Sequence, residues 1–359
     1  MKGRIMEERV LCYDMGGRRI RAAVATRRRI LASVNRDIPA RCDNRLLSST
    51  ALQMAGQVLR ASRTPARRLL GIGYGAAGEW HGLVIRFSPN NPVRHDITVA
   101  RDVRDKLCLP TLGANDLKAA VHAVPVYGHG RGRDLAVVCA ITYSDGNNIS
   151  ILNRNRPYPG YSDLSQEVGH AHIEHGPCAR WCGCGAQGCF EAYVSGTAAA
   201  HMAIEVLLAN WTRRHEQPIL RIARRAILRK RRKERKGGPL TEEQVLLGVR
   251  AEHVYEALAR HNDPISRHVR DVQKYYIAQQ LAHVCLHHRP QLIELFGGLT
   301  NQGKLLFAPA IADLRRHPAR YSSASFEATD IRITDLGDDI GLYGAASMVF
   351  LAHETGTLE

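Results

Sequence analysis

The stretch Cys182-Gly-Cys-Gly-Ala-Gln-Gly-Cys-Phe-Glu191 holds three thiols within eight residues and ends on a carboxylate. It follows Glu167-Val-Gly-His170, which supplies a second carboxylate and an imidazole. Because the intervening glycines allow a tight backbone, the three thiolates can surround one cation. We therefore expect a metal-bound loop at this point of the chain. The alternative is a set of free thiols without a metal.

Zinc is the metal that such a ligand set favours, because it prefers four nitrogen or sulfur ligands in a tetrahedron. The expected ligands are His170, Cys182, Cys184 and Cys189. Three side chains compete with His170 for the fourth position: His172, His175 and Cys178. Four protein ligands leave no position for water, so the zinc would be structural and would hold Glu167 and Glu191 on one rigid loop.

The composition indicates an ordinary globular chain. Its 359 residues suggest roughly two domains, and 45% hydrophobic with 23% charged residues exclude wholesale disorder. No run approaches the ~18 apolar residues of a membrane span, and residues 1–10 lack the apolar core of a signal peptide. We expect a soluble cytoplasmic protein, in which nine cysteines point to metal or redox chemistry rather than disulfides.

Most of the net charge comes from one segment. Residues Arg213 to Lys236 contain twelve Lys or Arg and two Glu, and so carry +10 of the total of +16. Apolar residues from Ile219 to Ile227 recur at helical spacing among the arginines, which predicts an amphipathic cationic helix. A solvated helix face is the ordinary interpretation; the alternative is contact with nucleic acid, an acidic partner or an anionic surface.

The rest of the chain alternates strands and helices, which predicts an α/β architecture. In the first part, apolar runs and their turns predict strands at 10–14, 20–25, 30–34 and 69–73, and a helix over 49–61 with Ser49 as its N-cap. In the second part, they predict strands at 135–142, 149–152 and 292–296, mainly helix from 195 to 288, a capping box at Thr241–Gln244, and a last helix over 341–351. The repeated strand, polar turn and strand indicate two similar lobes around a cleft.

Together with Tyr193-Val-Ser195-Gly196, the cysteine-rich motif resembles the signature of the ROK family (repressors, open reading frames and sugar kinases). The resemblance covers most of the chain. It includes Asp14–Gly17, similar to the first phosphate loop, Ala114–Asp116, similar to the catalytic Asn-Asp, and three further stretches: 71–73, 294–298 and 341–346. It implies a two-lobed, actin-like or hexokinase-type ATPase fold with ribonuclease H-like lobes and a zinc-bound loop.

The resemblance also implies boundaries and partners. The small lobe would comprise residues 1–113 plus about 345–359. The large lobe would comprise 114–344, with the zinc loop at 167–191 and a basic helical insert at about 205–238. The implied activity is ATP-dependent phosphorylation of a hexose or hexose derivative, with ATP and Mg²⁺ as cofactors, and the implied assembly is a homodimer. The sequence leaves the sugar open among glucose, fructose, mannose and N-acetylated hexosamines.

Roles for individual residues follow from the same resemblance. Asp116 would be the general base that takes the proton of the attacking hydroxyl. The side chains implied to hold the other hydroxyls are Asn115, Glu167, His170 and Glu191. Those implied on the nucleotide side are Asp14, Gly16, Gly17, Gly146, Gly297 and Gly298. Without the resemblance, a helix N-cap is the simpler interpretation of Asp116, since 114–120 resembles a helix start.

The nucleotide half departs from the family pattern. The first loop continues as Arg18-Arg19, and the second, Ser144–Ser150, keeps only Gly146 and adds Asp145. Glycines let backbone N–H groups approach phosphate, and a carboxylate repels it unless Mg²⁺ lies between them. Arg18 and Arg19 would compensate by binding phosphate. A non-catalytic sugar sensor with a degenerate nucleotide site is therefore the alternative function. Repressors of the family carry an N-terminal helix-turn-helix ahead of the sugar domain. A repressor of this construction is disfavoured, because the first family strand begins at about Val10 and leaves no room for that module.

Overall fold

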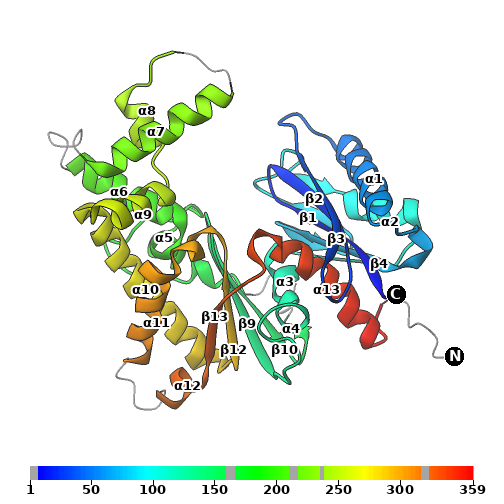
Figure 1. Ribbon diagram of the computed structural model, residues 1–359. Coiled ribbons are helices and arrows are strands. Elements are labelled where there is room, and N and C mark those ends of the chain that lie inside the picture. Colours follow the sequence, from blue (N-terminus) through cyan, green and yellow to red (C-terminus); the bar gives the residue numbers. More distant parts are fainter. Residues whose placement is uncertain (1–6, 159–165, 210–216, 235–237, 317–322, 359) are drawn as a thin grey trace.

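The computed structural model describes residues 7–158, 166–209, 217–234, 238–316 and 323–358. It contains two five-stranded sheets, each with its own helices, and a small three-stranded sheet (Figure 1). The two lobes expected from the alternating pattern are built on the two larger sheets. Arg213, Arg214, Arg235 and Lys236 of the basic segment lie outside the described residues.

The first sheet has the strand order β3-β2-β1-β4-β8. Strands β1, β2 and β3 pair antiparallel, whereas β4 and β8 continue the sheet in parallel with β1. Their bounds are β1 Arg9–Met15, β2 Arg19–Ala25, β3 Ile30–Asp37, β4 Leu69–Ala76 and β8 Thr111–Ala114. The side chains of residues 10–13 are fully buried, because helices or loops cover both faces of this central strand.

Two helices pack together on one side of this sheet, α1 Asn44–Ala61 and α2 Val99–Leu107. The predicted N-cap of α1, Ser49, is wrong. Asp43 is the cap, and its side chain accepts a hydrogen bond from the Leu46 amide at 2.7 Å. The helix therefore begins one and a half turns earlier than its apolar spacing indicated, and Ser49 donates to the Leu46 carbonyl from within it.

A three-stranded sheet that the sequence did not predict follows β4. It consists of β5 Glu79–His81, β6 Val84–Phe87 and β7 His95–Ile97. These strands are short and largely polar on their exposed face, so no periodic pattern marked them. The loop between β6 and β7 carries Asn90 to the edge of the cleft.

The second sheet has the order β11-β10-β9-β12-β13. As in the first sheet, the hairpin strands pair antiparallel and the two later strands run parallel to the central one. Its strands are β9 Val137–Tyr143, β10 Asn147–Asn153, β11 Arg156–Pro157, β12 Leu292–Phe296 and β13 Asp330–Ile333. The two sheets thus repeat one topology, in agreement with the repeated strand, turn and strand of the sequence.

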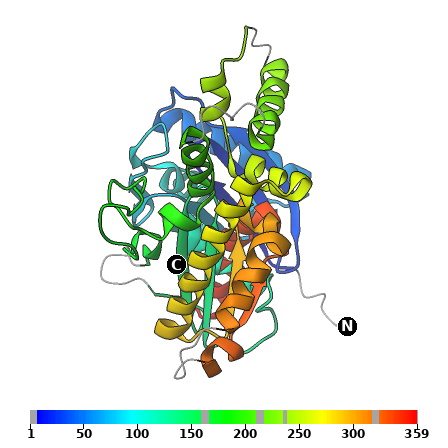
Figure 2. The same ribbon diagram turned by 90° about the vertical axis from the view of Figure 1, so that its left-hand side faces the viewer.

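Most other helices pack against the second sheet or against each other. They are α5 Glu191–Val194, α6 Gly196–Ala209, α7 Pro218–Lys233, α8 Glu242–Leu247, α9 Ala251–His261, α10 Pro264–His288, α11 Ala308–Arg315 and α12 Ser323–Ala328. Thr241 and Gln244 form the predicted capping box of α8. Helices α7 and α8 extend beyond the body of the large lobe (Figures 1 and 2).

Helices α3 Asp116–Val121 and α13 Ile340–Glu354 lie where the two sheets meet; the short α4 Ala123–Val126 follows α3 (Figure 1). Glycines bring backbones into direct contact here. A β-carbon at Gly73 of β4 would clash with the Ala345 carbonyl of α13, and one at Gly344 would clash with the Ala119 carbonyl of α3. Helix α13 is therefore pressed against both the first sheet and the helix that begins with Asp116.

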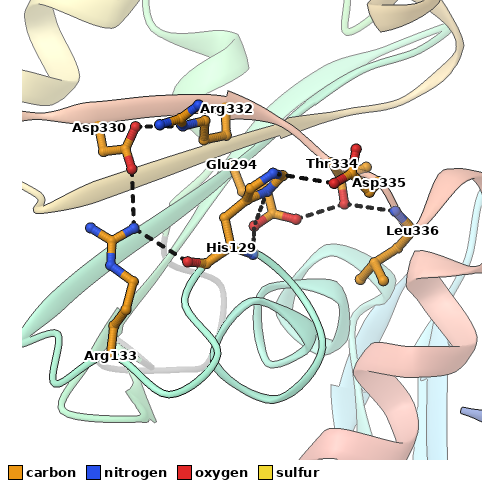
Figure 3. Close-up of polar contacts among 8 residues, drawn as sticks. All are labelled: His129, Arg133, Glu294, Asp330, Arg332, Thr334, Asp335 and Leu336. Atoms are coloured by element: carbon orange, nitrogen blue, oxygen red, sulfur yellow. Dashed lines mark hydrogen bonds and ion pairs between the residues drawn. The ribbon is translucent and has the colours of Figure 1, made fainter. Parts of the chain in front are cut away.

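A buried carboxylate fixes β12. Glu294 is completely buried and accepts hydrogen bonds from Thr334 Oγ1 at 2.6 Å and from the His129 amide at 3.1 Å (Figure 3). The His129 ring lies between carboxylates, with Nδ1 3.5 Å from Glu294 and Nε2 3.4 Å from Asp335. These contacts connect β12, which ends just before Gly297, to the loop after α4 and to the segment after β13. Across the described residues, no helix combines the length and apolar character that a bilayer crossing requires.

Candidate active site

Asp116 is the first residue of α3 and lines the cleft between the two sheets. Its carboxylate accepts from the Leu117 amide at 2.9 Å, but the N-cap of the helix is Asn115, whose Oδ1 accepts from the same amide at 3.1 Å. The capping function therefore belongs to Asn115. Asn115 also donates from Nδ2 to the Gly78 carbonyl at 3.4 Å, so the turn after β4 orients it.

The Asp116 carboxylate is harder to ionise than an ordinary aspartate. Burial in the cleft raises its pKa from 3.8 to about 6, and the negative charges of Asp14 and Glu167 add to the rise. Burial also raises the pKa of Asp14, against the lowering effect of Arg21. A base with a pKa near 6 is ionised at neutral pH and remains a useful proton acceptor.

One cavity, with a volume of about 620 Å³, is lined by Asn115 and Asp116 and also by Glu167, His170 and Glu191. Glu167 precedes a short 3₁₀ helix, Val168–His170, and accepts from Asn148 Nδ2 at 2.7 Å. Glu191 begins α5 and accepts from the Asn147 amide at 3.0 Å. The first two residues of β10, in the second sheet, therefore orient both acids.

The predicted metal ligands converge. The ligand atoms of His170, Cys182, Cys184 and Cys189 all lie within 4.8 Å of one another. Cys182 Sγ lies 3.6 Å from His170 Nδ1, and the Sγ atoms of Cys184 and Cys189 are 3.8 Å apart. With bonds of ~2.3 Å to sulfur and ~2.0 Å to nitrogen, a tetrahedral zinc site has ligand separations of about 3.5–3.8 Å. The donor set therefore fits zinc, and the competing side chains, His172, His175 and Cys178, are not part of this group.

The loop geometry explains how four side chains reach one point. Gly188 has φ +84°, and a side chain there would clash with the Glu174 carbonyl. Gly185 has φ +90°, a conformation that only glycine adopts readily. An antiparallel bridge joins His172 to Cys189, and another joins Trp181 to Gln187. Cys182 also donates to Glu191 Oε1 at 3.5 Å, so the ligand cluster directly contacts one of the cleft carboxylates.

The glycines expected on the nucleotide side fall into two groups. Gly146, Gly297 and Gly298 line the Asp116 cavity together with Asp14. Gly16 and Gly17 do not; they line an adjoining cavity of about 1000 Å³ that shares Asp14 with the first. Gly297 has φ +99°, and a β-carbon there would lie 2.5 Å from the Tyr143 carbonyl, so this turn packs closely on the end of β9.

A third cavity, of about 790 Å³, continues from the cleft over the large lobe. Ser144, Asp145 and Gly298 line both this cavity and the Asp116 cavity, so the two are adjacent. Its other walls come from the starts of α6 and α9, including Thr197, Arg250 and Glu252. Sequence reasoning did not identify these wall residues, because no local pattern distinguishes them.

The described part of the basic segment forms α7. Its apolar residues Ile219, Ile222 and Ala223 are buried, and the helix packs against α8 and α9. Its cations are largely exposed at positions 221, 224, 225, 229, 230, 232 and 233. No α7 residue lines the three cavities described above. The predicted amphipathic helix is confirmed, with its apolar residues buried and most of its cations exposed.

Known proteins resemble this chain in sequence and in fold. The model of the ROK family matches residues 10–351. The glucokinase of Thermotoga maritima is 26% identical over 83% of this chain and 84% of its own, and that of Streptomyces coelicolor is 25% identical over 93% and 95%. The fold resembles the ROK hexokinase of Thermus thermophilus, with a TM-score of 0.72, 22% identity and coverage of 97% of this chain and 100% of that chain.

A second solved structure is the ROK family glucokinase of Streptomyces griseus in complex with glucose and AMPPNP. It has a TM-score of 0.66 and 23% identity, over 95% of this chain and 98% of its own. These likenesses establish the two-lobed, actin-like ATPase fold, and within it this chain has the cysteine and histidine cluster described above. Because the family model spans nearly the whole sequence, the chain belongs to the ROK family.

Proposed function

We propose that this protein is an ATP-dependent sugar kinase that transfers the γ-phosphoryl group of ATP to a hydroxyl of a hexose. The observation that carries the proposal is one cavity lined by Asp116, Glu167, His170 and Glu191 together with the glycine turns at 146 and 297–298. Relatives named as glucokinases match over most of both chains, which supports the same activity here. Curated relatives named as repressors match a smaller part: the xylose repressor of Bacillus subtilis is 33% identical over 31% of this chain, which gives the sensor alternative less support.

In the proposed reaction, the hexose lies against Glu167, His170 and Glu191, whose acceptor atoms suit several hydroxyl groups. Asp116, ionised at neutral pH, accepts the proton of the reacting hydroxyl. The hydroxyl oxygen forms the new bond to the γ-phosphorus, and the bond from that phosphorus to the oxygen of ADP breaks. The products are a hexose phosphate and ADP.

Mg²⁺ would accompany ATP and neutralise charge on its phosphates. Asp14 and Asp145 are the carboxylates placed to meet such an ion, since both line the Asp116 cavity at its nucleotide side. Asp145 also reaches into the adjacent cavity over α6 and α9. The acid in the second loop, which would repel a bare triphosphate, is therefore suited to hold the metal.

We further propose that zinc occupies the His170, Cys182, Cys184 and Cys189 cluster and is structural. The fit between ligand separations and a tetrahedral zinc site supports this. Zinc would fix His170 and, because Glu191 follows the ligand Cys189 by only two residues, would also restrain the position of Glu191. The carbohydrate side of the cleft would then be ordered before a sugar binds.

The activity is tested with purified protein, MgATP and a panel of glucose, mannose, fructose and N-acetylmannosamine, with ADP release followed by a coupled assay. We expect turnover with one or more of these sugars and a 10²- to 10⁴-fold lower kcat for Asp116→Asn. Absence of turnover with every sugar, in protein shown to contain zinc, would contradict the proposal. Equal activity of Asp116→Asn would contradict the assigned base.

The proposed assembly is the homodimer that the family resemblance implies, in the cytoplasm. Multi-angle light scattering of the zinc-loaded protein measures the mass directly. A value of about 80 kDa, twice the chain mass of 39.8 kDa, is expected. A mass of one chain at micromolar concentration would refute the dimer and leave the kinase proposal standing.

A further inference from the structure

Arg21 lies directly opposite Asp14 across the β1–β2 hairpin. Its Nε donates to Asp14 Oδ2 at 3.0 Å, and a terminal nitrogen forms a second contact with the same carboxylate. The guanidinium also donates to the Asp338 carbonyl at 2.6 Å and to Asp339 Oδ1 at 3.1 Å. It is thus held in one orientation by the first strand and by the segment that leads into α13.

Arg21 is also the single lysine or arginine among the described residues that line the Asp116 cavity. That lining includes six carboxylates: Asp14, Asp116, Asp145, Glu167, Glu191 and Asp338. A cleft with this balance repels a triphosphate, and the Mg²⁺ proposed at Asp14 and Asp145 offsets only part of that charge, so a fixed cation in the cleft would favour nucleotide binding. Arg18 and Arg19, expected from sequence to do this, line only the neighbouring cavity, and Arg19 pairs with Asp37 at 3.5 Å.

Three backbone amides of the second loop already donate within the protein. The Asn147 amide donates to Glu191 at 3.0 Å, the Ser144 amide donates to the Gly146 carbonyl at 3.0 Å, and the Ile149 amide donates to Asn148 Oδ1 at 2.8 Å. These donors are already used, whereas phosphate loops of glycine-rich type leave such N–H groups free for the ligand. A side-chain cation must therefore replace part of the missing backbone contacts.

We propose that Arg21 binds the γ-phosphate of ATP and stabilises the charge that develops on it during transfer. Four of the five N–H groups of Arg21 already donate to Asp14, Asp338 and Asp339, so nucleotide binding would exchange the contacts with Asp338 and Asp339 for phosphate oxygens. The planar guanidinium can make this exchange while it keeps its bond to Asp14. The inference rests on the proposed kinase function and adds a residue that the family resemblance does not assign. Asp339 would hold the guanidinium until the nucleotide arrives.

The test compares Arg21→Met and Arg21→Lys with Arg27→Met as a matched control. Arg27 belongs to the turn after β2, is similarly half-buried and is paired with Glu8 at 2.6 Å, but it lies outside the cleft. Calorimetry with Mg-AMPPNP and Mg-ADP, and steady-state kinetics with the accepted sugar, are measured for each protein. Thermal unfolding records the structural cost of each change.

For Arg21→Met we expect AMPPNP to bind about 10- to 100-fold more weakly and ADP to bind within about threefold of wild type. We also expect kcat to fall about 10²-fold or more. Arg21→Lys should keep part of the AMPPNP affinity that Arg21→Met loses. Arg27→Met should change the affinity for neither AMPPNP nor ADP.

Equal weakening of AMPPNP and ADP, or a lower melting temperature with unchanged nucleotide affinity and kcat, would show that Arg21 is a structural latch and would overturn the inference. If Arg21→Met weakens AMPPNP binding but the wild-type protein phosphorylates no sugar, only the kinase function is refuted. A wild type that binds no nucleotide would overturn both.

Discussion

The buried carboxylate of Asp116 lowers the stability of the folded protein at neutral pH, and replacing it should reveal this effect. Its folded-state pKa of about 6 exceeds the unfolded value of 3.8, so the folded protein binds the extra proton between these pH values. Stability is therefore lost as the pH rises from about 4 to above 6, where the ionised carboxylate lies near Asp14 and Glu167. Asp116→Asn should raise the free energy of unfolding by about 1–3 kcal/mol at pH 7.5 and change it little at pH 4.

Urea unfolding at the two pH values measures this difference, and Asp105→Asn, an exposed aspartate of α2, is the control. The same titration should make kcat/KM of the wild type rise with pH, with a midpoint near 6, because the base must be ionised. A destabilised Asp116→Asn at pH 7.5 would contradict the raised pKa. A pH-independent kcat/KM between pH 5 and 8 would argue against Asp116 as the base.

At the scale of elements, the cysteine loop is the part that the sequence predicted in most detail. Cys184 and Cys178 are both exposed cysteines in this loop, but only Cys184 belongs to the ligand cluster. Cys184→Ser should reduce bound zinc from about one ion per chain to a small fraction and raise the KM for sugar at least tenfold, because His170 and Glu191 lose their common anchor.

Cys178→Ser is the matched control and should keep both the zinc and the KM of the wild type. Zinc is quantified by atomic spectrometry after gel filtration, alongside steady-state kinetics. Zinc loss in Cys178→Ser equal to that in Cys184→Ser would mean that the ligand set has been assigned wrongly. Removal of zinc from the wild type by a chelator should reproduce the kinetic defect of Cys184→Ser.

The elements also show where sequence reasoning stops. The buried strands were predicted because continuous apolar runs mark them, and the ligand loop because its spacing is local. The sheet of β5, β6 and β7 was missed because its strands are short and half-polar. Arg21 was missed for a different reason: its role depends on Asp14 across the hairpin and on Asp339, which is more than 300 residues away in sequence. No local pattern records such a pairing.

At the scale of the whole molecule, the exposed cations of α7 lie outside the three cavities described above. Replacing Arg224, Arg225, Arg229 and Arg232 with glutamine lowers the formal net charge from +16 to +12. Since these residues are exposed and line none of the three cavities, kcat/KM should stay within about twofold and the melting temperature within a few degrees. A tenfold loss of kcat/KM would instead place this face in the binding of the phosphate donor.

The two lobes meet through the backbones of β4, α13 and α3, where Gly73 and Gly344 have no side chain to keep the chains apart. The position of Asp116 in the cleft therefore depends on two close backbone contacts, that of Gly73 with α13 and that of Gly344 with α3. A single alanine at either position would force α13 outward and tilt the start of α3, even though neither glycine faces the reactants. In the proposed kinase, the alignment of the two substrates for phosphoryl transfer would thus depend on backbone packing between the lobes, at residues that line none of the cavities.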